Sequence, residues 1–154
     1  MHGKGRKAGD KVPDLLFFDD SMILGDNDGT TLTIIEFKRP SRNDYAMGSG
    51  KSDPILQVLK TLEKSVADGG ITKTDGTYFS FANVVRKFAF VIADITPTLY
   101  DVLDKHDFHN DWNPNVFTSY RDRAGIFIQV FGYDTLVENA KKRNQAFFKV
   151  LLDE

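Results

Sequence analysis

LTIIEFK, at residues 32–38, is an apolar, β-branched run that ends in a carboxylate and an ammonium two residues apart. Residues of these types favour a β-strand. Because successive side chains of a strand point to opposite faces, Glu36 and Lys38 share one face of the predicted strand. The sequence therefore predicts that these two charged groups lie together at the end of a strand.

A third charged group belongs to the preceding segment. Asp14 follows Pro13 and heads another apolar run, LLFF, at residues 15–18. The sequence GDNDG at 25–29 is a strong turn signal, which predicts an antiparallel hairpin that brings Asp14 near the far end of the second strand. Two carboxylates and a lysine on neighbouring strands suit a divalent-metal nuclease, in which the acids hold the ion and the lysine handles water or phosphate.

The totals of the chain limit the classes of protein to consider. It has 154 residues, 41% of them hydrophobic and 27% charged, and a net charge of −2, which predicts one ordinary globular domain at 13–154. Residues 1–12 are expected to be a flexible basic segment without the apolar core of a signal peptide. The chain has no cysteine, which excludes disulfides, thiolate zinc sites and thiol nucleophiles and favours a cytoplasmic location. No apolar run is long enough to cross a membrane.

The rest of the chain alternates helical and strand patterns. Pro40 ends the second strand, and Asp53-Pro54 has the form of a helix start. The further predictions are a helix to Gly69, a turn-rich connection at 71–83, a buried central strand at 88–93, a short helix at 97–106, strands at 116–120 and 125–131, and a last helix at 134–152. This order predicts an α/β or α+β domain with a mixed central sheet flanked by helices.

The charged residues of the two predicted strands and a glutamine on the following helix resemble the signature of a known family. Pro13-Asp14 and Glu36-Phe37-Lys38, followed by Gln57 on the next helix, resemble the P-D…(D/E)-x-K signature of the PD-(D/E)xK nuclease superfamily, whose core is that of type II restriction endonucleases. The segments IEFKRP at 35–40, RNDY at 42–45, IADITP at 92–97 and NAKKRN at 139–144 are similar to a bacterial subfamily of such domains. Members of that subfamily often form the C-terminal part of a larger protein, sometimes behind a GHKL-type ATPase module.

The resemblance implies a restriction-endonuclease-like fold and a set of site residues. Asp14, Glu36 and the backbone carbonyl of Phe37 would hold Mg²⁺ or Mn²⁺. Lys38 would hydrogen-bond the attacking water or the phosphate, and Gln57 would orient the water or contact DNA. The core of the superfamily usually begins with a helix before the Asp-bearing strand, and here that helix is expected to be missing or truncated. It could have been lost, belong to a longer protein or come from a partner.

Three residues beyond the motif are candidates for contact with nucleic acid. Arg39 and Arg42 could clamp the phosphate backbone, and plain surface charge is the alternative for both. Tyr45 could stack on a base, and packing within its loop is the alternative. No base-reading element is evident, so we expect little sequence specificity.

Three functions remain open at this stage. The leading hypothesis is Mg²⁺-dependent hydrolysis of nucleic acid, DNA rather than RNA, as part of a larger bacterial defence or repair protein with a fused or partner ATPase. The second is a catalytically inactive module of the same fold that binds nucleic acid or docks a partner. The third is an oligomerisation domain, such as a homodimer, with the Phe-rich C-terminal helix as its interface.

Three weaker signals are set aside. GSGKS at 48–52 resembles the end of a P-loop, but Tyr45 stands where the motif needs glycine. DNDG at 26–29 resembles part of a calcium loop, but Leu24 and Ile35 occupy ligand positions. His106 and His109 have acidic neighbours and are expected to lie at a helix end and loop rather than on a metal.

Overall fold

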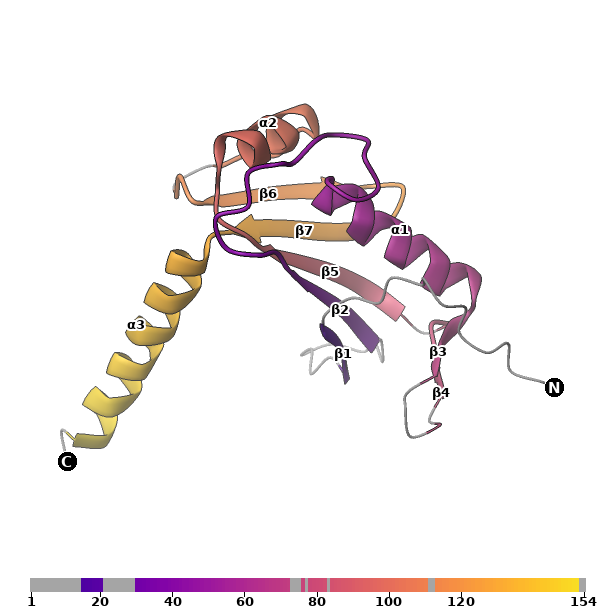
Figure 1. Ribbon diagram of the computed structural model, residues 1–154. Coiled ribbons are helices and arrows are strands. Elements are labelled where there is room, and N and C mark those ends of the chain that lie inside the picture. Colours follow the sequence, from indigo (N-terminus) through magenta and orange to yellow (C-terminus); the bar gives the residue numbers. More distant parts are fainter. Residues whose placement is uncertain are drawn as a thin grey trace.

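The computed structural model describes residues 15–20, 30–72, 76, 78–82, 84–110 and 113–152 (Figure 1). Their order is two strands, a helix, a short hairpin, a strand, a helix, two strands and a final helix. The elements are β1 (Leu15–Asp20), β2 (Thr30–Phe37), α1 (Pro54–Ala67), β3 (Gly70–Thr72), β4 (Tyr78–Ser80), β5 (Val84–Ile92), α2 (Pro97–Lys105), β6 (Val116–Arg121), β7 (Ile126–Phe131) and α3 (Tyr133–Leu152). Apart from the short hairpin, this is the predicted order.

Five of the strands form one mixed sheet with the order β1-β2-β5-β7-β6. The predicted hairpin is confirmed, because β1 and β2 pair antiparallel and Leu15 lies opposite Ile35. The crossover through α1 makes β5 parallel to β2, and the crossover through α2 and β6 makes β7 parallel to β5. The α+β class and the mixed sheet are thereby confirmed, with β5 as the central strand.

The main core lies between one face of the sheet and two helices. Leu32 and Ile34 of β2 alternate with partly exposed neighbours, which is the pattern of a strand with one covered face. They pack in one cluster with apolar residues of α1 (Ile55, Val58, Leu62), of α2 (Leu99, Val102, Leu103) and of the neighbouring strands (Ala89, Val91, Ile126, Ile128, Val130). Glu36 and Lys38 continue this row of β2, so their side chains lie on the helix-covered face.

The opposite face of the sheet is aromatic. Phe88 and Phe127 make an edge-to-face pair with ring centroids 6.3 Å apart, and Phe90 and Phe131 make another at 6.4 Å. All four rings are partly exposed, and Phe37 at the end of β2 is 41% exposed. Helix α3 leaves the end of β7 and extends away from the body of the sheet (Figure 1).

Two segment boundaries differ from the sequence predictions. The turn-rich connection at 71–83 contains the β3–β4 hairpin, in which Gly70 lies opposite Ser80. Strand β5 begins at Val84 rather than at Phe88. The charged residues at its start lie outside the apolar run that predicted the strand, and Lys87 satisfies its ammonium by donating to the Ala124 carbonyl, 3.0 Å away.

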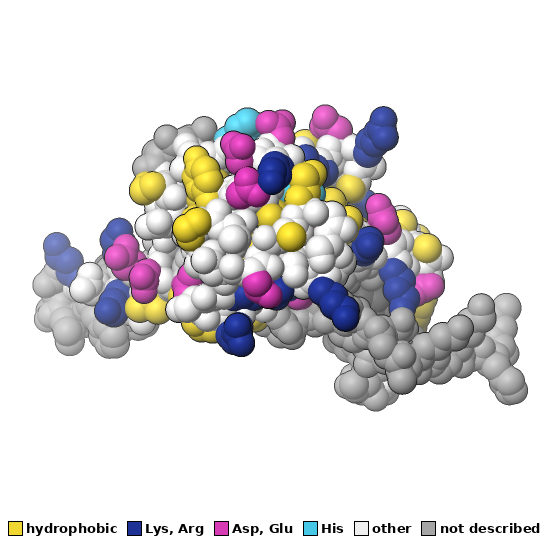
Figure 2. All heavy atoms as spheres, turned by 45° about the horizontal axis from the view of Figure 1, so that its top comes forward, with side chains coloured by type: hydrophobic (Ala, Val, Ile, Leu, Met, Phe, Trp, Pro, Cys, Tyr) yellow, Lys and Arg dark blue, Asp and Glu magenta, His cyan; other side chains and the backbone are white. Residues whose placement is uncertain are grey.

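None of the helices in the described part of the chain combines the length and the apolar character needed to cross a membrane. The surface over α1 and α2 carries interspersed positive and negative side chains (Figure 2). Such mixing agrees with the small net charge of −2 and gives this face no uniform field.

Candidate active site

The centre of the candidate site is the buried ammonium of Lys38 at the end of β2. The residue is 6% exposed, and its Nζ lies 2.5 Å from Glu36 Oε1 and 2.5 Å from Gln57 Oε1. A buried charge is tolerated when it is paired and hydrogen-bonded, and here one carboxylate and one amide oxygen supply that pairing. The structure thus brings together three of the predicted site residues.

Gln57 reaches Lys38 from α1. Asp53 begins this helix as its N-cap, and Pro54 occupies the first helical position, which places Gln57 one turn into the helix and toward the sheet. The side chain is 8% exposed, and its Nε2 donates to the Gly50 carbonyl at 3.2 Å. Because one end of the amide donates to Gly50 and the other accepts from Lys38, the orientation of the amide is determined.

The backbone of Lys38 is held from two further elements. Its N–H donates to the Ile92 carbonyl at 2.9 Å, and the Tyr133 hydroxyl donates to its carbonyl at 2.6 Å. Tyr133 was not predicted from the sequence, because it lies 95 residues away and only the fold brings α3 to the end of β2. Since adjacent backbone carbonyls of a strand point to opposite sides, the Phe37 carbonyl faces the β1 side of β2.

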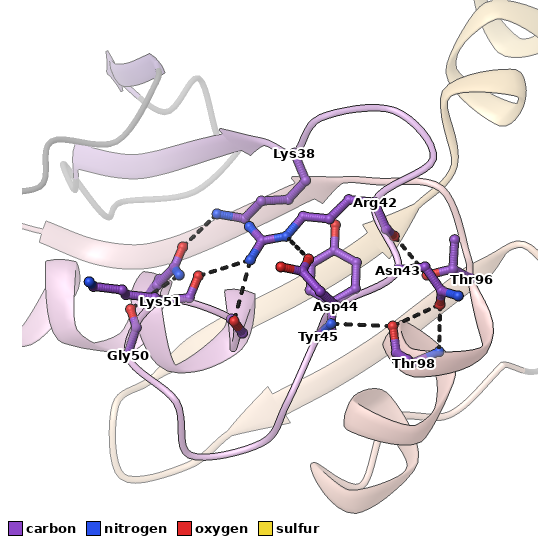
Figure 3. A network of polar contacts seen from close by, with 11 residues as sticks. Lys38, Arg42, Asn43, Asp44, Tyr45, Gly50, Lys51, Thr96 and Thr98 are labelled. Atoms are coloured by element: carbon purple, nitrogen blue, oxygen red, sulfur yellow. Dashed lines mark hydrogen bonds and ion pairs between the residues drawn. The ribbon is translucent and has the colours of Figure 1, made fainter.

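Arg42 is engaged within the loop that follows β2 (Figure 3). Its Nε lies 2.5 Å from Asp44 Oδ1, and its guanidinium also donates to the Lys51 carbonyl and to Ser52 Oγ, at 3.2 and 3.4 Å. The hydrogen bond from Arg42 lowers the pKa of Asp44 below its usual value. The guanidinium therefore links this loop to the turn before α1.

Tyr45 belongs to the core. It is 6% exposed, and the Arg42 guanidinium lies over its ring, 4.9 Å from the centroid. Burial raises its pKa to about 12. The structure therefore favours the packing interpretation of Tyr45 over base stacking, because its ring is covered on the side where Arg42 lies. Arg39, in contrast, is exposed at the surface.

A second segment, between β5 and α2, fixes the same loop. Asp94 accepts from the Ser41 N–H at 2.6 Å, and Thr96 Oγ1 donates to the Arg42 carbonyl at 2.9 Å. At the start of α2, Thr98 Oγ1 accepts a hydrogen bond from the Tyr45 N–H at 3.3 Å. The Thr98 N–H and hydroxyl donate to the Asn43 side chain (Figure 3). Two motifs that were quoted separately in the sequence, at 42–45 and 92–97, are thus partners in space.

The start of α1, one turn before Gln57, is capped by a buried acid. Asp53 is fully buried, and its carboxylate accepts from the N–H groups of Gly48, Ile55 and Leu56 and contacts His106 Nε2 at 2.8 Å. Burial would raise its pKa, but the hydrogen bonds from Leu56, His106 and Gly48 outweigh burial, so the pKa is lowered. Within the P-loop-like stretch, the Gly48 N–H donates to Asp53 and those of Ser49 and Ser52 donate to backbone carbonyls, so these three groups are already used within the protein. His106 lies at the end of α2, as predicted, and binds Asp53, while His109 pairs through its backbone with Thr118.

The predicted metal site can be compared with the donors that the structure describes. Glu36 and the Phe37 carbonyl are hard oxygen donors of the kind that Mg²⁺ prefers. Asp14 lies outside the described residues. Within those residues, no group of three or more His, Cys, Asp or Glu side chains could hold a metal ion. The donor types fit a hard cation, and the second carboxylate expected from the motif, that of Asp14, lies outside the described residues.

Comparison with protein-family models, with curated proteins and with solved structures finds no match to this chain. The resemblance to the PD-(D/E)xK superfamily therefore stays a prediction from the residues of the motif.

Proposed function

We propose that this chain is a divalent-metal-dependent nuclease domain that hydrolyses phosphodiester bonds of nucleic acid. The observation that carries the proposal is the buried Lys38 ammonium between Glu36 and Gln57. Removing a lysine ammonium and a carboxylate from water costs free energy. Buried charges of this kind are concentrated at functional sites, and here the ammonium could act on a phosphate or on its attacking water.

Each residue of the proposed site has a chemical task. Asp14, Glu36 and the Phe37 carbonyl would hold Mg²⁺ or Mn²⁺, which when bound stabilises negative charge on the phosphate and acidifies water. The Lys38 ammonium would donate a hydrogen bond to the attacking water or to a phosphate oxygen. Gln57 would keep the ammonium in place, and exposed Arg39 would contact the phosphate backbone.

The wider setting belongs to the same proposal. We expect DNA rather than RNA as substrate, cleavage with little sequence specificity, a cytoplasmic location, and work within a larger bacterial defence or repair protein, with a fused or partner ATPase module. A second candidate is a catalytically inactive module that binds nucleic acid or a partner. The observation that favours it is that no group of three or more His, Cys, Asp or Glu side chains among the described residues could hold a metal ion.

The deciding experiment is cleavage of supercoiled plasmid, linear duplex DNA, single-stranded DNA and single-stranded RNA with Mg²⁺ or Mn²⁺. We expect metal-dependent cleavage of DNA that falls by about 10²-fold or more in Lys38→Ala, because one charged donor to the reacting groups is lost. Lys105→Ala is the matched control, since Lys105 is an exposed lysine of α2 whose ammonium pairs with Asp101. Binding of DNA without cleavage by the wild type would favour the inactive module, and cleavage that survives in Lys38→Ala would overturn the proposed site.

A further inference from the structure

We propose that Lys38 is the resident counter-ion of Glu36 in the metal-free protein, and that a divalent cation binds by displacing its ammonium from Glu36 onto Gln57. This inference rests on the proposed function, because it concerns the same carboxylate. It adds a role for Lys38 before any substrate arrives. The ammonium weakens metal binding by occupying Glu36, and metal binding in turn releases the ammonium from Glu36.

The geometry of the three side chains carries the inference. One ammonium is shared between two oxygens, each 2.5 Å away, and one of these oxygens belongs to Glu36. When a divalent cation binds the Glu36 carboxylate, two positive charges, the cation and the Lys38 ammonium, compete for the same group and repel each other. The repulsion favours movement of the ammonium away from Glu36. The exposed fraction of the two side chains is 7% for Lys38 and 19% for Glu36, so water screens their interaction only in part.

Gln57 supplies the position to which the ammonium moves. Its Oε1 already accepts from Lys38, and its Nε2 is held by the Gly50 carbonyl at 3.2 Å. A displaced ammonium therefore keeps one good acceptor and stays in the site. Without Gln57, displacement from Glu36 would leave a buried charge with no acceptor from α1, which is costly.

The test is Mn²⁺ binding to the full chain, measured by the EPR signal of free Mn²⁺ and by calorimetry, without nucleic acid. Lys38→Met removes the charge and keeps an unbranched side chain of similar length, and we expect it to bind Mn²⁺ roughly tenfold more tightly than the wild type. Gln57→Met removes the acceptor and is expected to bind roughly tenfold more weakly. Lys38→Arg keeps the charge and is expected to show no such gain.

A double variant tests whether Gln57 acts through Lys38. In the Lys38→Met background, adding Gln57→Met should leave Mn²⁺ affinity unchanged, because no ammonium remains to be displaced. Mn²⁺ binding by the wild type with equal or weaker binding by Lys38→Met would overturn the counter-ion role and leave the proposed nuclease site intact. Absence of Mn²⁺ binding in the wild type and in all variants would overturn both.

An observation on the wild type covers the case in which Lys38→Met does not fold. In protein with ¹³C-labelled lysine, the Lys38 Cε resonance is identified by its loss in Lys38→Arg. We expect this resonance to shift during an Mg²⁺ titration and to saturate with the dissociation constant found by calorimetry. Mg²⁺ binding without a shift would contradict the displacement.

Discussion

At the scale of single residues, Tyr45 combines a buried aromatic ring with a buried hydroxyl. The Tyr45 hydroxyl is buried and finds no hydrogen-bond partner among the described residues, while its ring packs in the core and under Arg42. A buried polar group without a partner costs free energy, whereas the ring that carries it contributes packing.

This contrast predicts opposite results for two substitutions. Tyr45→Phe removes only the hydroxyl, and we expect the free energy of unfolding to stay the same or rise by up to about 1 kcal/mol. Tyr45→Ala also removes the ring and is expected to lower it by about 3–5 kcal/mol. Urea unfolding of the wild type and both variants checks this; a clear loss of stability in Tyr45→Phe would show that the hydroxyl has a partner in solution.

Ser41 carries a local backbone cost. Its φ of +57° lies in the left-handed region, which is unfavourable for a residue with a side chain. The hydrogen bond of the Ser41 N–H to Asp94, at 2.6 Å, holds the residue in this conformation.

Ser41→Gly should relieve this cost. We expect a net gain of about 0.5 kcal/mol in the free energy of unfolding, after the larger backbone entropy of glycine in the unfolded chain is subtracted. Ser41→Ala is the control, since alanine keeps the Cβ and should give no gain. Equal stability of the two variants in urea unfolding would argue against backbone cost at this position.

At the scale of elements, the two helices that cover the sheet are joined by one buried pair. Asp53 caps the start of α1 and contacts His106, the residue that follows α2, at 2.8 Å. Arg121 of β6 donates to the His106 carbonyl and so closes the end of α2. The pair holds the helix that carries Gln57 against the segment that fixes the loop after β2.

The lowered pKa of Asp53 predicts a pH dependence of stability. Because the folded protein holds this carboxylate ionised more strongly than the unfolded chain does, the stabilisation is present above the ordinary pKa of 3.8 and is lost as the pH falls through the folded value. We expect Asp53→Asn to cost about 1–2 kcal/mol near pH 7, because the hydrogen bonds from Gly48 and His106 lose their ionised acceptor, while asparagine can still cap the helix. The difference between wild type and Asp53→Asn should shrink as the pH falls below 3.8.

Urea unfolding of both proteins from pH 7 down to acidic pH measures this difference. Asp104→Asn, at an exposed aspartate of α2, is the control and should show little change at either end of the range. A wild type that keeps its full advantage over Asp53→Asn in acid would contradict the role of the ionised carboxylate.

At the scale of the whole molecule, the sheet has two unequal faces. One face is covered by α1 and α2 and is fully buried at positions such as Ile128. The other face carries partly exposed Phe88, Phe90, Phe127 and Phe131, while α3 extends away from the body (Figure 1). The stability of the domain should therefore depend mainly on the covered face.

Two neighbouring residues of β7 test this asymmetry. Ile128→Ala should lower the free energy of unfolding by about 2–5 kcal/mol, because it leaves a cavity in a packed core. Phe127→Ala removes a larger side chain but should cost less, because its ring is already partly hydrated and water can fill the space. A larger loss for Phe127→Ala would mean that the aromatic face is covered in solution.

The sequence alone determined much of the fold. The alternation at 30–38 with the turn signal at 25–29 predicted the hairpin, Asp53-Pro54 predicted the start of the first helix, and the apolar run at 88–93 predicted the central strand. These signals are local, which is why the sequence alone carries them. The same alternation placed Glu36 and Lys38 on one face, which the structure confirms. The start of β5 escaped prediction because its charged Lys87 is accommodated by a carbonyl 37 residues away. The β3–β4 hairpin escaped because its two strands are short and lie among turn-forming residues.

Only the tertiary structure decided which partners meet. The amide of Gln57, the hydroxyl of Tyr133 and the 94–98 segment reach the end of β2 from elements that are 19 to 95 residues away in the chain. It also decided that Tyr45 belongs to the core and that Arg42 serves its own loop. Local sequence sets the period and the ends of each element, whereas burial and long-range hydrogen bonds depend on how the elements pack, and that packing is a property of the whole chain.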